Sequence, residues 1–123
     1  MWLFTKYGFF SAVCARDMET GLPDQSLVMV RSRNAKHLAM LKERFDVLED
    51  CEIMKYTGSD YPARIFVHKG VWSCVVSQLA AEISYSNFKS EVSSSKAMRD
   101  DRRYRESLHE VWATMACSEP ELA

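Results

Sequence analysis

The first sixteen residues, MWLFTKYGFFSAVCAR, constrain the fold of this chain more than any other stretch. They hold Trp, Phe, Tyr, Thr and Val at high density, which is typical of a β-strand. Because side chains alternate between the two faces of a strand, residues 2–15 predict one long strand with aromatic side chains on both faces. Gly8 in its middle indicates a bulge or bend, at which the faces can switch. The rest of the chain must then cover one face of this strand and leave the other available.

The length of 123 residues suits a single domain, which we expect over residues 1–117 with a frayed C-terminal tail at residues 118–123. Apolar residues make up 47% of the chain and charged residues 27%, as in an ordinary globular protein. No apolar run approaches the roughly 18 residues that span a bilayer, and the N-terminus lacks the basic region and cleavage site of a signal peptide. We therefore expect a cytoplasmic protein with no membrane partner.

The four cysteines, Cys14, Cys51, Cys74 and Cys117, lie far apart. They form no CxxC pair and have no histidine at zinc-finger spacing. We expect buried, reduced thiols that act as small apolar side chains. The sequence accordingly predicts no disulfide, no metal and no cofactor.

Hydrophobic spacing predicts the remaining elements. Residues 27–31 form a short apolar strand, after which Ser32 or Asn34 can cap a helix over about four turns. Residues 51–57 and 63–68 form a hairpin across the turn residues 58–62. A second helix follows over residues 71–83, and residue 87 and the serine run 93–95 interrupt the pattern. A third helix places on one face its large apolar residues: Tyr104, Leu108, Val111, Trp112 and Met115.

This order is ββαββα with an extra C-terminal helix. It predicts an α+β fold with a four-stranded, largely antiparallel sheet and helices on one face. The arrangement corresponds to a ferredoxin-like βαββαβ sandwich whose last strand has moved to the front of the chain.

Three stretches carry a resemblance to known proteins, namely residues 1–16, IFVHKGVW at 65–72 and YSNFKSEV at 85–92. Together they resemble a group of small bacterial proteins that open with MWLFTKYGFFS and have no established activity. The resemblance covers most of the chain and implies a bacterial or phage cytoplasmic protein, with no catalytic residues to carry over. The run KYGFF at 6–10 is also similar, in ingredients but not in spacing, to the aromatic RNA-binding stripe of RRM domains.

The first candidate site is the sheet face that the helices leave uncovered. If Leu3, Ile65 and Val67 face the helices, the opposite face holds six candidate partner-binding residues: Trp2, Phe4, Lys6, Arg64, Phe66 and His68. Strict alternation also places Phe10 with them. Aromatic and cationic side chains suit a protein interface or stacking on bases with phosphate contacts. The alternative is that the third helix or a second copy covers this face and makes it core.

The second candidate site is a basic run where a strand leads into a helix. From residue 31 to residue 44 the chain carries five Lys or Arg (Arg31, Arg33, Lys36, Lys42, Arg44) and one acid (Glu43), a local charge of +4 against a total of −1. The candidate anion-binding residues are Arg31, Ser32, Arg33, Asn34 and Lys36. The alternative is a set of solvated charges beside an amphipathic helix.

Catalytic patterns are few. His37 beside the basic run could act in metal-free phosphodiester cleavage, with Tyr7 or Tyr61 nearby. His109 lies among glutamates on a helix without the spacing of a metal site, and the chain contains no P-loop, dinucleotide fingerprint or GxSxG. The charges at residues 99–106 mix both signs at helical spacing, as on a solvated helix face.

These patterns predict a non-catalytic binding or regulatory module that engages a protein partner, or a second copy of itself, through the aromatic and basic sheet face. The alternative is an RNA- or nucleotide-binding protein, including a metal-independent phosphodiesterase that uses His37.

Overall fold

The computed structural model describes residues 1–118, and contacts along the chain group into two compact units. The first unit spans Met1–Ser84 and the second begins at Tyr85. The sequence predicts one domain over residues 1–117, and the boundary between the units falls inside this range. No helix within residues 1–118 has the length and apolar character needed to cross a membrane.

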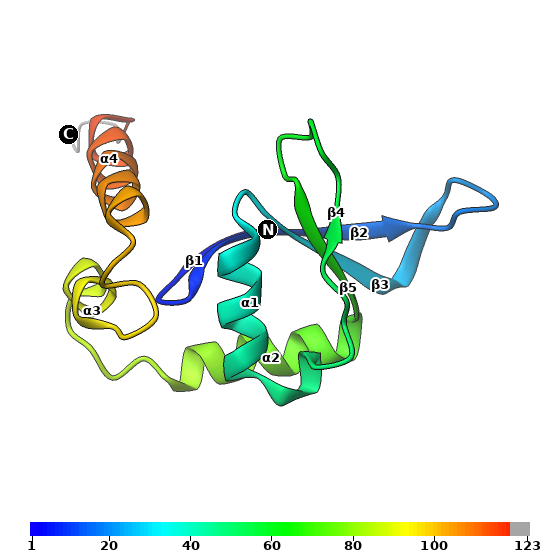
Figure 1. The fold of residues 1–123 in the computed structure, drawn as a ribbon, viewed down its shortest axis with the longest axis horizontal. Helices are drawn as coiled ribbons and strands as arrows, with labels where there is room; N and C mark the ends of the chain where they lie inside the picture. The colour runs from blue at the N-terminus through cyan, green and yellow to red at the C-terminus, as the bar shows by residue number, and fades with distance from the viewer. Residues whose placement is uncertain (119–123) are drawn as a thin grey trace, which may run out of the picture. The chain divides into compact units, whose positions relative to one another are not determined.

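The first unit is built on a five-stranded antiparallel sheet (Figure 1). Its strands are β1 (Trp2–Thr5), β2 (Gly8–Arg16), β3 (Pro23–Ser32), β4 (Met54–Lys55) and β5 (Ala63–His68). They lie in the order β1-β2-β3-β5-β4, and every neighbouring pair is antiparallel. The α+β class and the antiparallel sheet are therefore confirmed, whereas the expected count of four strands is wrong.

The extra strand arises because the opening stretch is a hairpin and not one long strand. The chain turns between β1 and β2, where the Tyr7 amide donates to the Thr5 hydroxyl oxygen (3.0 Å) and that hydroxyl donates to the Gly8 carbonyl (2.9 Å). Gly8 has φ +137°, which side-chain-bearing residues rarely adopt. A β-carbon at Gly8 would also clash with the His37 ring. Apolar density is equally high in a strand and in a hairpin, so only this glycine marks the turn.

Two helices pack on one face of the sheet. These are α1 (Ala35–Arg44) and α2 (Lys69–Ala81). The extended residue Phe45 ends α1, and a short 3-10 turn follows at Asp46–Leu48. Asn34 caps α1 by accepting a hydrogen bond from the Lys36 amide (3.0 Å), so of the two predicted caps, Ser32 and Asn34, the second begins this helix. The second helix follows β5 without an intervening residue.

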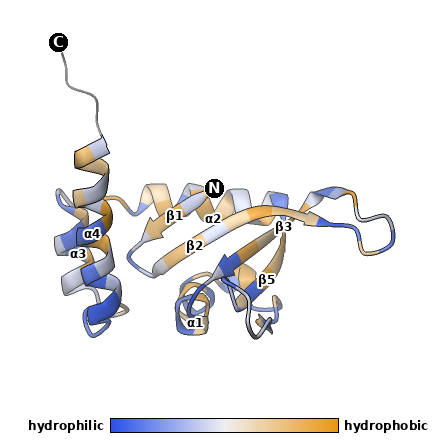
Figure 2. Cartoon of the chain, turned by 90° about the horizontal axis from the view of Figure 1, so that it is seen from above, coloured by the Kyte–Doolittle hydropathy of each residue, from blue (hydrophilic) through white to orange (hydrophobic). Residues whose placement is uncertain are grey.

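The core of the first unit lies between these helices and the sheet. The strands contribute Phe10, Val30, Ile65 and Val67, which are buried, and the helices contribute a second set: Leu38, Leu41, Trp72 and Val75. The hydrophobic stretches of β2, β3 and β5 can be followed in Figure 2. Burial of one such side chain stabilises the fold by about 1.5–3 kcal/mol. The alternation along β5 predicted this face correctly.

The second unit consists of α3 (Phe88–Ser94) and α4 (Arg102–Ser118). The expected interruption at Asn87 is confirmed, because Asn87 lies between two helices and caps α3 by accepting from the Ser90 amide (2.9 Å). The expected interruption at the serine run is wrong for Ser93 and Ser94, which lie inside α3, whereas Ser95 is its C-cap. The third predicted helix is present as α4. Of its expected apolar face Tyr104 and Leu108 are buried, whereas Trp112 and Met115 are exposed. Ser118, placed in the frayed tail by the sequence, ends α4, and residues 119–123 lie outside the described residues.

Candidate functional site

In the register of the sheet, one row of directly opposite residues crosses all five strands. Trp2 on β1 lies opposite Ser11 on β2, which lies opposite Arg31 on β3. Arg31 in turn lies opposite Arg64 on β5, and Arg64 lies opposite Met54 on β4. Residues directly opposite one another in an antiparallel sheet share a face, so all five side chains lie on the face that α1 and α2 leave uncovered.

The neighbouring rows complete this surface. Phe4 lies opposite Phe9, and Met29 lies opposite Phe66. We call this surface the aromatic–arginine face and define it by Trp2, Phe4, Phe9, Arg31, Arg33, Tyr56, Tyr61, Arg64 and Phe66. Five of the six predicted partner-binding residues lie on this side of the sheet: Trp2, Phe4, Arg64, Phe66 and His68. The sixth, Lys6, lies in the turn between β1 and β2.

The expected position of Phe10 on this face is wrong. Phe10 lies opposite Leu3 and is buried under the helices, and Phe9 takes the place expected for it. The turn before Gly8 reverses the chain and changes which residues of the second strand share a face with Trp2 and Phe4. Strict alternation through residues 2–15 cannot reproduce this switch.

At the β1 edge, three aromatic rings form a continuous cluster. The Phe4 and Phe9 rings are stacked, with centroids 4.5 Å apart and an interplanar angle of 20°. The Trp2 ring meets the Phe9 ring edge-on at 5.9 Å. Trp2 is 68% exposed and Phe4 36% exposed. A flat ring surface therefore remains accessible at this edge of the sheet.

Beside these rings, three arginines gather around two tyrosines of the β4–β5 loop. The guanidinium carbon of Arg31 lies 4.5 Å from the Tyr61 ring centroid, and that of Arg33 lies 4.9 Å from the same centroid. Arg64 lies 4.4 Å from the Tyr56 ring centroid. The Tyr61 ring also lies 6.4 Å from the Phe9 ring, so the arginine cluster and the aromatic cluster are continuous.

The β4–β5 loop holds these tyrosines in place through its own hydrogen bonds. The Tyr56 amide donates to the Pro62 carbonyl (2.8 Å), and Gly58 takes φ +86° at the turn. Tyr61 is only 4% exposed although it lies in a polar loop. The predicted hairpin is thus confirmed. Its turn supplies Tyr56, which sequence reasoning missed, and places Tyr61, expected only near His37, against the arginines of the sheet face. The signal for Tyr61 was a large aromatic residue next to a proline in an otherwise polar turn.

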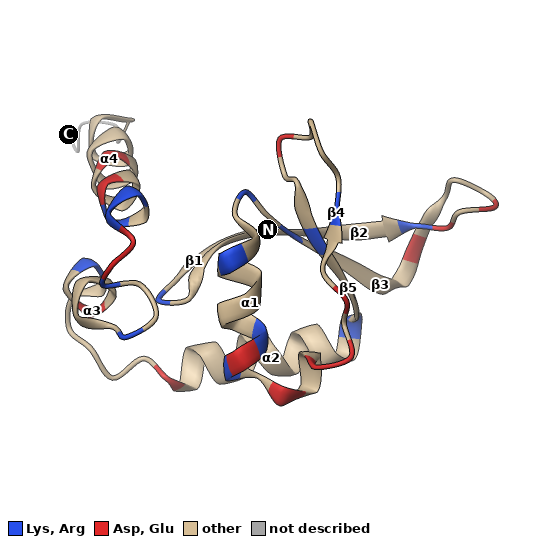
Figure 3. Cartoon of the chain, in the orientation of Figure 1, with Lys and Arg blue, Asp and Glu red and all other residues tan. Residues whose placement is uncertain are grey.

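Two of the three guanidinium groups, those of Arg31 and Arg64, donate hydrogen bonds to neutral acceptors. Arg31 donates from Nη2 to the Ser11 hydroxyl oxygen (2.8 Å). Arg64 donates from Nε to the Tyr61 carbonyl (3.1 Å) and from Nη2 to the Ser59 hydroxyl oxygen (2.7 Å). Within residues 1–118 no carboxylate forms an ion pair with Arg31, Arg33 or Arg64, and the buried Nε of Arg31 lacks an acceptor there. Figure 3 shows the basic positions of β3 and β5 side by side.

Like charges directly across a sheet are destabilising, and Arg31 and Arg64 occupy such a pair of positions. Stacking on tyrosine offsets part of this cost, since a cation over an aromatic ring contributes about 0.5–2 kcal/mol. A bound anion would offset the remainder through charge-assisted hydrogen bonds. Chemically, this part of the face is therefore suited to hold an anion.

The predicted anion-binding run is divided by the fold. Arg31 and Arg33 join the aromatic–arginine face, whereas Ser32 points to the helix face, is fully buried and donates its hydroxyl to the Asn34 carbonyl (2.8 Å). Asn34 is occupied as the cap of α1, and Lys36 lies exposed in the first turn of that helix. The two predicted sites therefore merge into one surface through Arg31.

His37, the weak catalytic candidate, lies beneath the β1–β2 hairpin. It is 7% exposed, and its Nδ1 accepts a hydrogen bond from the Phe9 amide (3.4 Å). A buried ring that supports the backbone of β2 is in a structural position, remote from solvent. The geometry favours support of the hairpin over proton transfer to a ligand.

A second polar network fixes the same hairpin to the helix ends. The Tyr7 hydroxyl donates to Glu82 Oε2 (2.9 Å), and Glu82 forms an ion pair with Arg44 at the end of α1. Burial, followed by the hydrogen bond to Glu82, raises the pKa of Tyr7 above its usual value. This network joins the β1–β2 turn to the ends of α1 and α2 and so holds the aromatic cluster in register.

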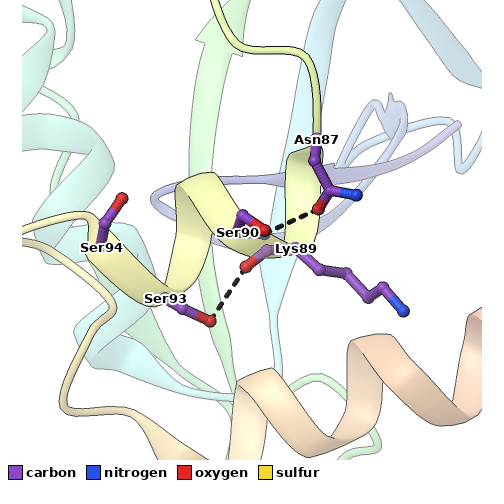
Figure 4. Close-up of a pocket in the computed structure, with 5 residues that line it drawn as sticks. All are labelled: Asn87, Lys89, Ser90, Ser93 and Ser94. Carbon is purple, nitrogen blue, oxygen red and sulfur yellow. Dashed lines mark hydrogen bonds between the residues drawn. The ribbon is translucent and has the colours of Figure 1, made fainter.

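In the second unit, an open hollow of about 560 Å³ is lined by Asn87, Lys89, Ser90, Ser93 and Ser94 (Figure 4). The Ser93 hydroxyl donates to the Lys89 carbonyl (3.0 Å), and the Ser94 hydroxyl donates to a helix carbonyl as well. The Lys89 ammonium lies 4.5 Å from the Trp112 ring centroid and 3.4 Å from His109 Nδ1. These groups serve contacts between α3 and α4, so the hollow is a weaker ligand candidate than the sheet face.

The part of the chain that the structure describes contains no group of three or more His, Cys, Asp or Glu placed to hold a metal.

The expectation of buried cysteines is wrong, because Cys14, Cys74 and Cys117 are exposed and Cys51 is half-buried. All four are free thiols. Apolar neighbours in sequence do not ensure burial when the residue lies on the outer side of a strand or helix.

Comparisons of this chain with protein-family models, with curated proteins and with solved structures find no match.

Proposed function

We propose that this protein is a non-catalytic binding module that holds an anionic ligand on its aromatic–arginine face. One observation carries the proposal: Arg31, Arg33 and Arg64 gather around Tyr61 and Tyr56, and no carboxylate in the described residues pairs with any of them. The net charge of the whole chain is −1, so this local excess of positive charge is a property of one surface.

The chemistry of the side chains supports an oxyanion as the ligand. Guanidinium groups present several donors in one plane and match carboxylate and phosphate oxygens better than ammonium groups do. Stacking on Tyr61 and Tyr56 restricts the rotamers of the arginines before a ligand arrives. Less conformational entropy is then lost on binding, which raises affinity.

Calorimetric titration with inorganic tripolyphosphate tests this proposal. Replacement of the exposed Arg33 by Gln removes one cation from the cluster, and we expect affinity to fall about tenfold, since one charge-assisted hydrogen bond contributes about 1.5–3 kcal/mol. Arg16→Gln is the matched control, because Arg16 is an exposed arginine that bonds to the Gly21 carbonyl outside the face. Equal affinity in both variants, or no binding by the wild type, would contradict the proposal.

A protein partner, including a second copy of the chain, is the second candidate. The observation that favours it is the exposed aromatic edge, where Trp2 is 68% exposed beside Phe4. Tryptophan and arginine are frequent anchors of protein interfaces. Light scattering on the wild type and on Phe66→Glu tests the self-partner: a dimer that becomes a folded monomer supports it, and a monomeric wild type argues against it.

We also infer a permuted ferredoxin-like sandwich as the framework of the binding module. The support is that β2, β3, β5 and β4 lie in this order with α1 and α2 on one face, which is the order that a ferredoxin-like sheet would keep after its last strand moved to the front. The strand β1 is then an addition at the edge of the sheet, and it carries Trp2 and Phe4.

A further inference from the structure

We infer that the anionic ligand of the aromatic–arginine face is a single-stranded nucleic acid; this inference rests on the proposed function. The face offers two kinds of contact within one continuous surface. Exposed rings lie at the β1 edge, and the guanidinium groups of Arg31 and Arg64, which have no carboxylate partner in the described residues, lie on the central strands β3 and β5. A single strand has both complementary groups, because each nucleotide carries a flat base and a charged phosphate.

The aromatic cluster is arranged for stacking. Phe4 and Phe9 already lie nearly parallel, at 20°, and Trp2 stands edge-on beside them with most of its surface exposed. An unstacked base can extend this arrangement by covering the exposed ring surface. One such contact contributes about 1–3 kcal/mol and tolerates any base, because every base has a flat face.

The arginine cluster lies where the backbone of such a strand would pass. Tyr61 connects the two clusters, since its ring contacts Arg31 and Arg33 and lies 6.4 Å from Phe9. A strand whose base stacks at the β1 edge therefore reaches the guanidinium groups with the adjacent phosphates. A duplex presents the same phosphates but keeps its bases inside, so the rings at the β1 edge would remain without a partner.

An acidic peptide would satisfy the arginines without occupying the rings to the same extent. The combination of three cations without carboxylate partners and a stacked ring pair is explained most completely by a ligand that is both charged and planar. We therefore assign the face to a single-stranded nucleic acid in preference to a protein segment.

The experiment compares three fluorescent probes by anisotropy at low and moderate salt. The probes are an oligothymidine of about ten nucleotides, within the usual footprint of such surfaces, an abasic strand with the same number of phosphates, and a duplex of the same length. We expect the full-length wild type to bind the oligothymidine at least tenfold more tightly than the abasic strand and the duplex. Affinity for all three probes should fall as salt rises.

Two variants assign the contacts. Trp2→Ala should reduce affinity for the oligothymidine about tenfold and leave affinity for the abasic strand unchanged, whereas Arg33→Gln should weaken both. The control is Leu22→Ala, which removes another exposed apolar side chain outside the face. Both target residues are exposed, so circular dichroism should show each variant folded.

The outcomes separate the two proposals. If the oligothymidine and the abasic strand bind equally, the face holds anions and the inference of a nucleic acid is overturned. If the duplex binds most tightly, the inference is overturned as well. If none of the probes binds, the inference of a nucleic acid is overturned, and the proposed function fails as well only if the wild type also does not bind tripolyphosphate.

Discussion

Arg31 on β3 and Arg64 on β5 lie directly opposite each other on one face of the sheet, each stacked on a tyrosine from the same loop. Two like charges are rarely found at directly opposite positions of neighbouring strands, because their repulsion weakens the strand pairing. Here the pair is retained without a carboxylate partner in residues 1–118. We interpret it as a position prepared for a ligand, and the stability of the protein should then depend on anions.

The first prediction concerns this dependence. Tripolyphosphate should raise the unfolding temperature of the wild type, because a ligand at about 100 times its dissociation constant stabilises the native state by about 2.7 kcal/mol. In Arg31→Gln the increase should be largely lost. Differential scanning fluorimetry at constant ionic strength measures both, with Arg16→Gln as the control that should keep the increase.

The second prediction concerns the turn of the opening hairpin. Gly8→Ala should destabilise the protein by about 3 kcal/mol or more, since a positive φ alone costs a side-chain-bearing residue about 1–3 kcal/mol and the new β-carbon meets the His37 ring. Urea unfolding measures the change. Gly70→Ala on α2 is the matched substitution, because no atom lies within 4 Å of the added β-carbon. A comparable loss in both variants would show that the turn geometry is not the cause.

The third prediction concerns the hydroxyl of Tyr7. Tyr7→Phe should cost about 0.5–1.5 kcal/mol, the usual net contribution of one hydrogen bond, and leave Glu82 paired with Arg44. Because the pKa of Tyr7 is raised in the folded state, its contribution to stability is complete below about pH 10, the unfolded pKa, and is lost as the pH rises through the folded value. Ultraviolet titration should show that the variant lacks one late-ionising tyrosine; an unchanged late phase would contradict the assignment.

The fourth prediction separates a structural role from a ligand role at Asn34. Asn34→Ala should lower the free energy of unfolding by about 1 kcal/mol through loss of the α1 cap, and Asn34→Asp should restore it. Neither substitution should change tripolyphosphate affinity more than twofold if Asn34 serves only the helix. A tenfold loss of tripolyphosphate affinity in Asn34→Ala, measured where the variant is fully folded, would show that Asn34 contributes to anion binding.

Several parts of the fold could be read from the sequence because local patterns determined them. The alternation of Ile65 and Val67 with Arg64 and Phe66 gave the two faces of β5 correctly, and Asn34 identified the start of α1. The same local patterns did not predict α3, since Asn87 and the serines favour turns as well as helix caps. Local preference does not decide between these two uses.

The composition of the candidate site depended on long-range geometry and was therefore only partly predictable. Phe9 and not Phe10 lies on the aromatic–arginine face, because the chain reverses before Gly8. Tyr61 is brought onto Arg31 by the β4–β5 loop, thirty residues away in sequence. No periodicity links these two residues, and the merging of the two predicted sites into one surface follows from the strand register alone.

All residues that define the aromatic–arginine face lie between Trp2 and Phe66, inside the first compact unit. The residues of this face and the helical unit from Tyr85 onward are therefore encoded in separate stretches of the gene. Substitutions in the two stretches can accumulate at different rates during evolution. Substitutions from Tyr85 onward would leave the residues of this face unchanged, so the proposed binding could be inherited while the second unit acquired a different role.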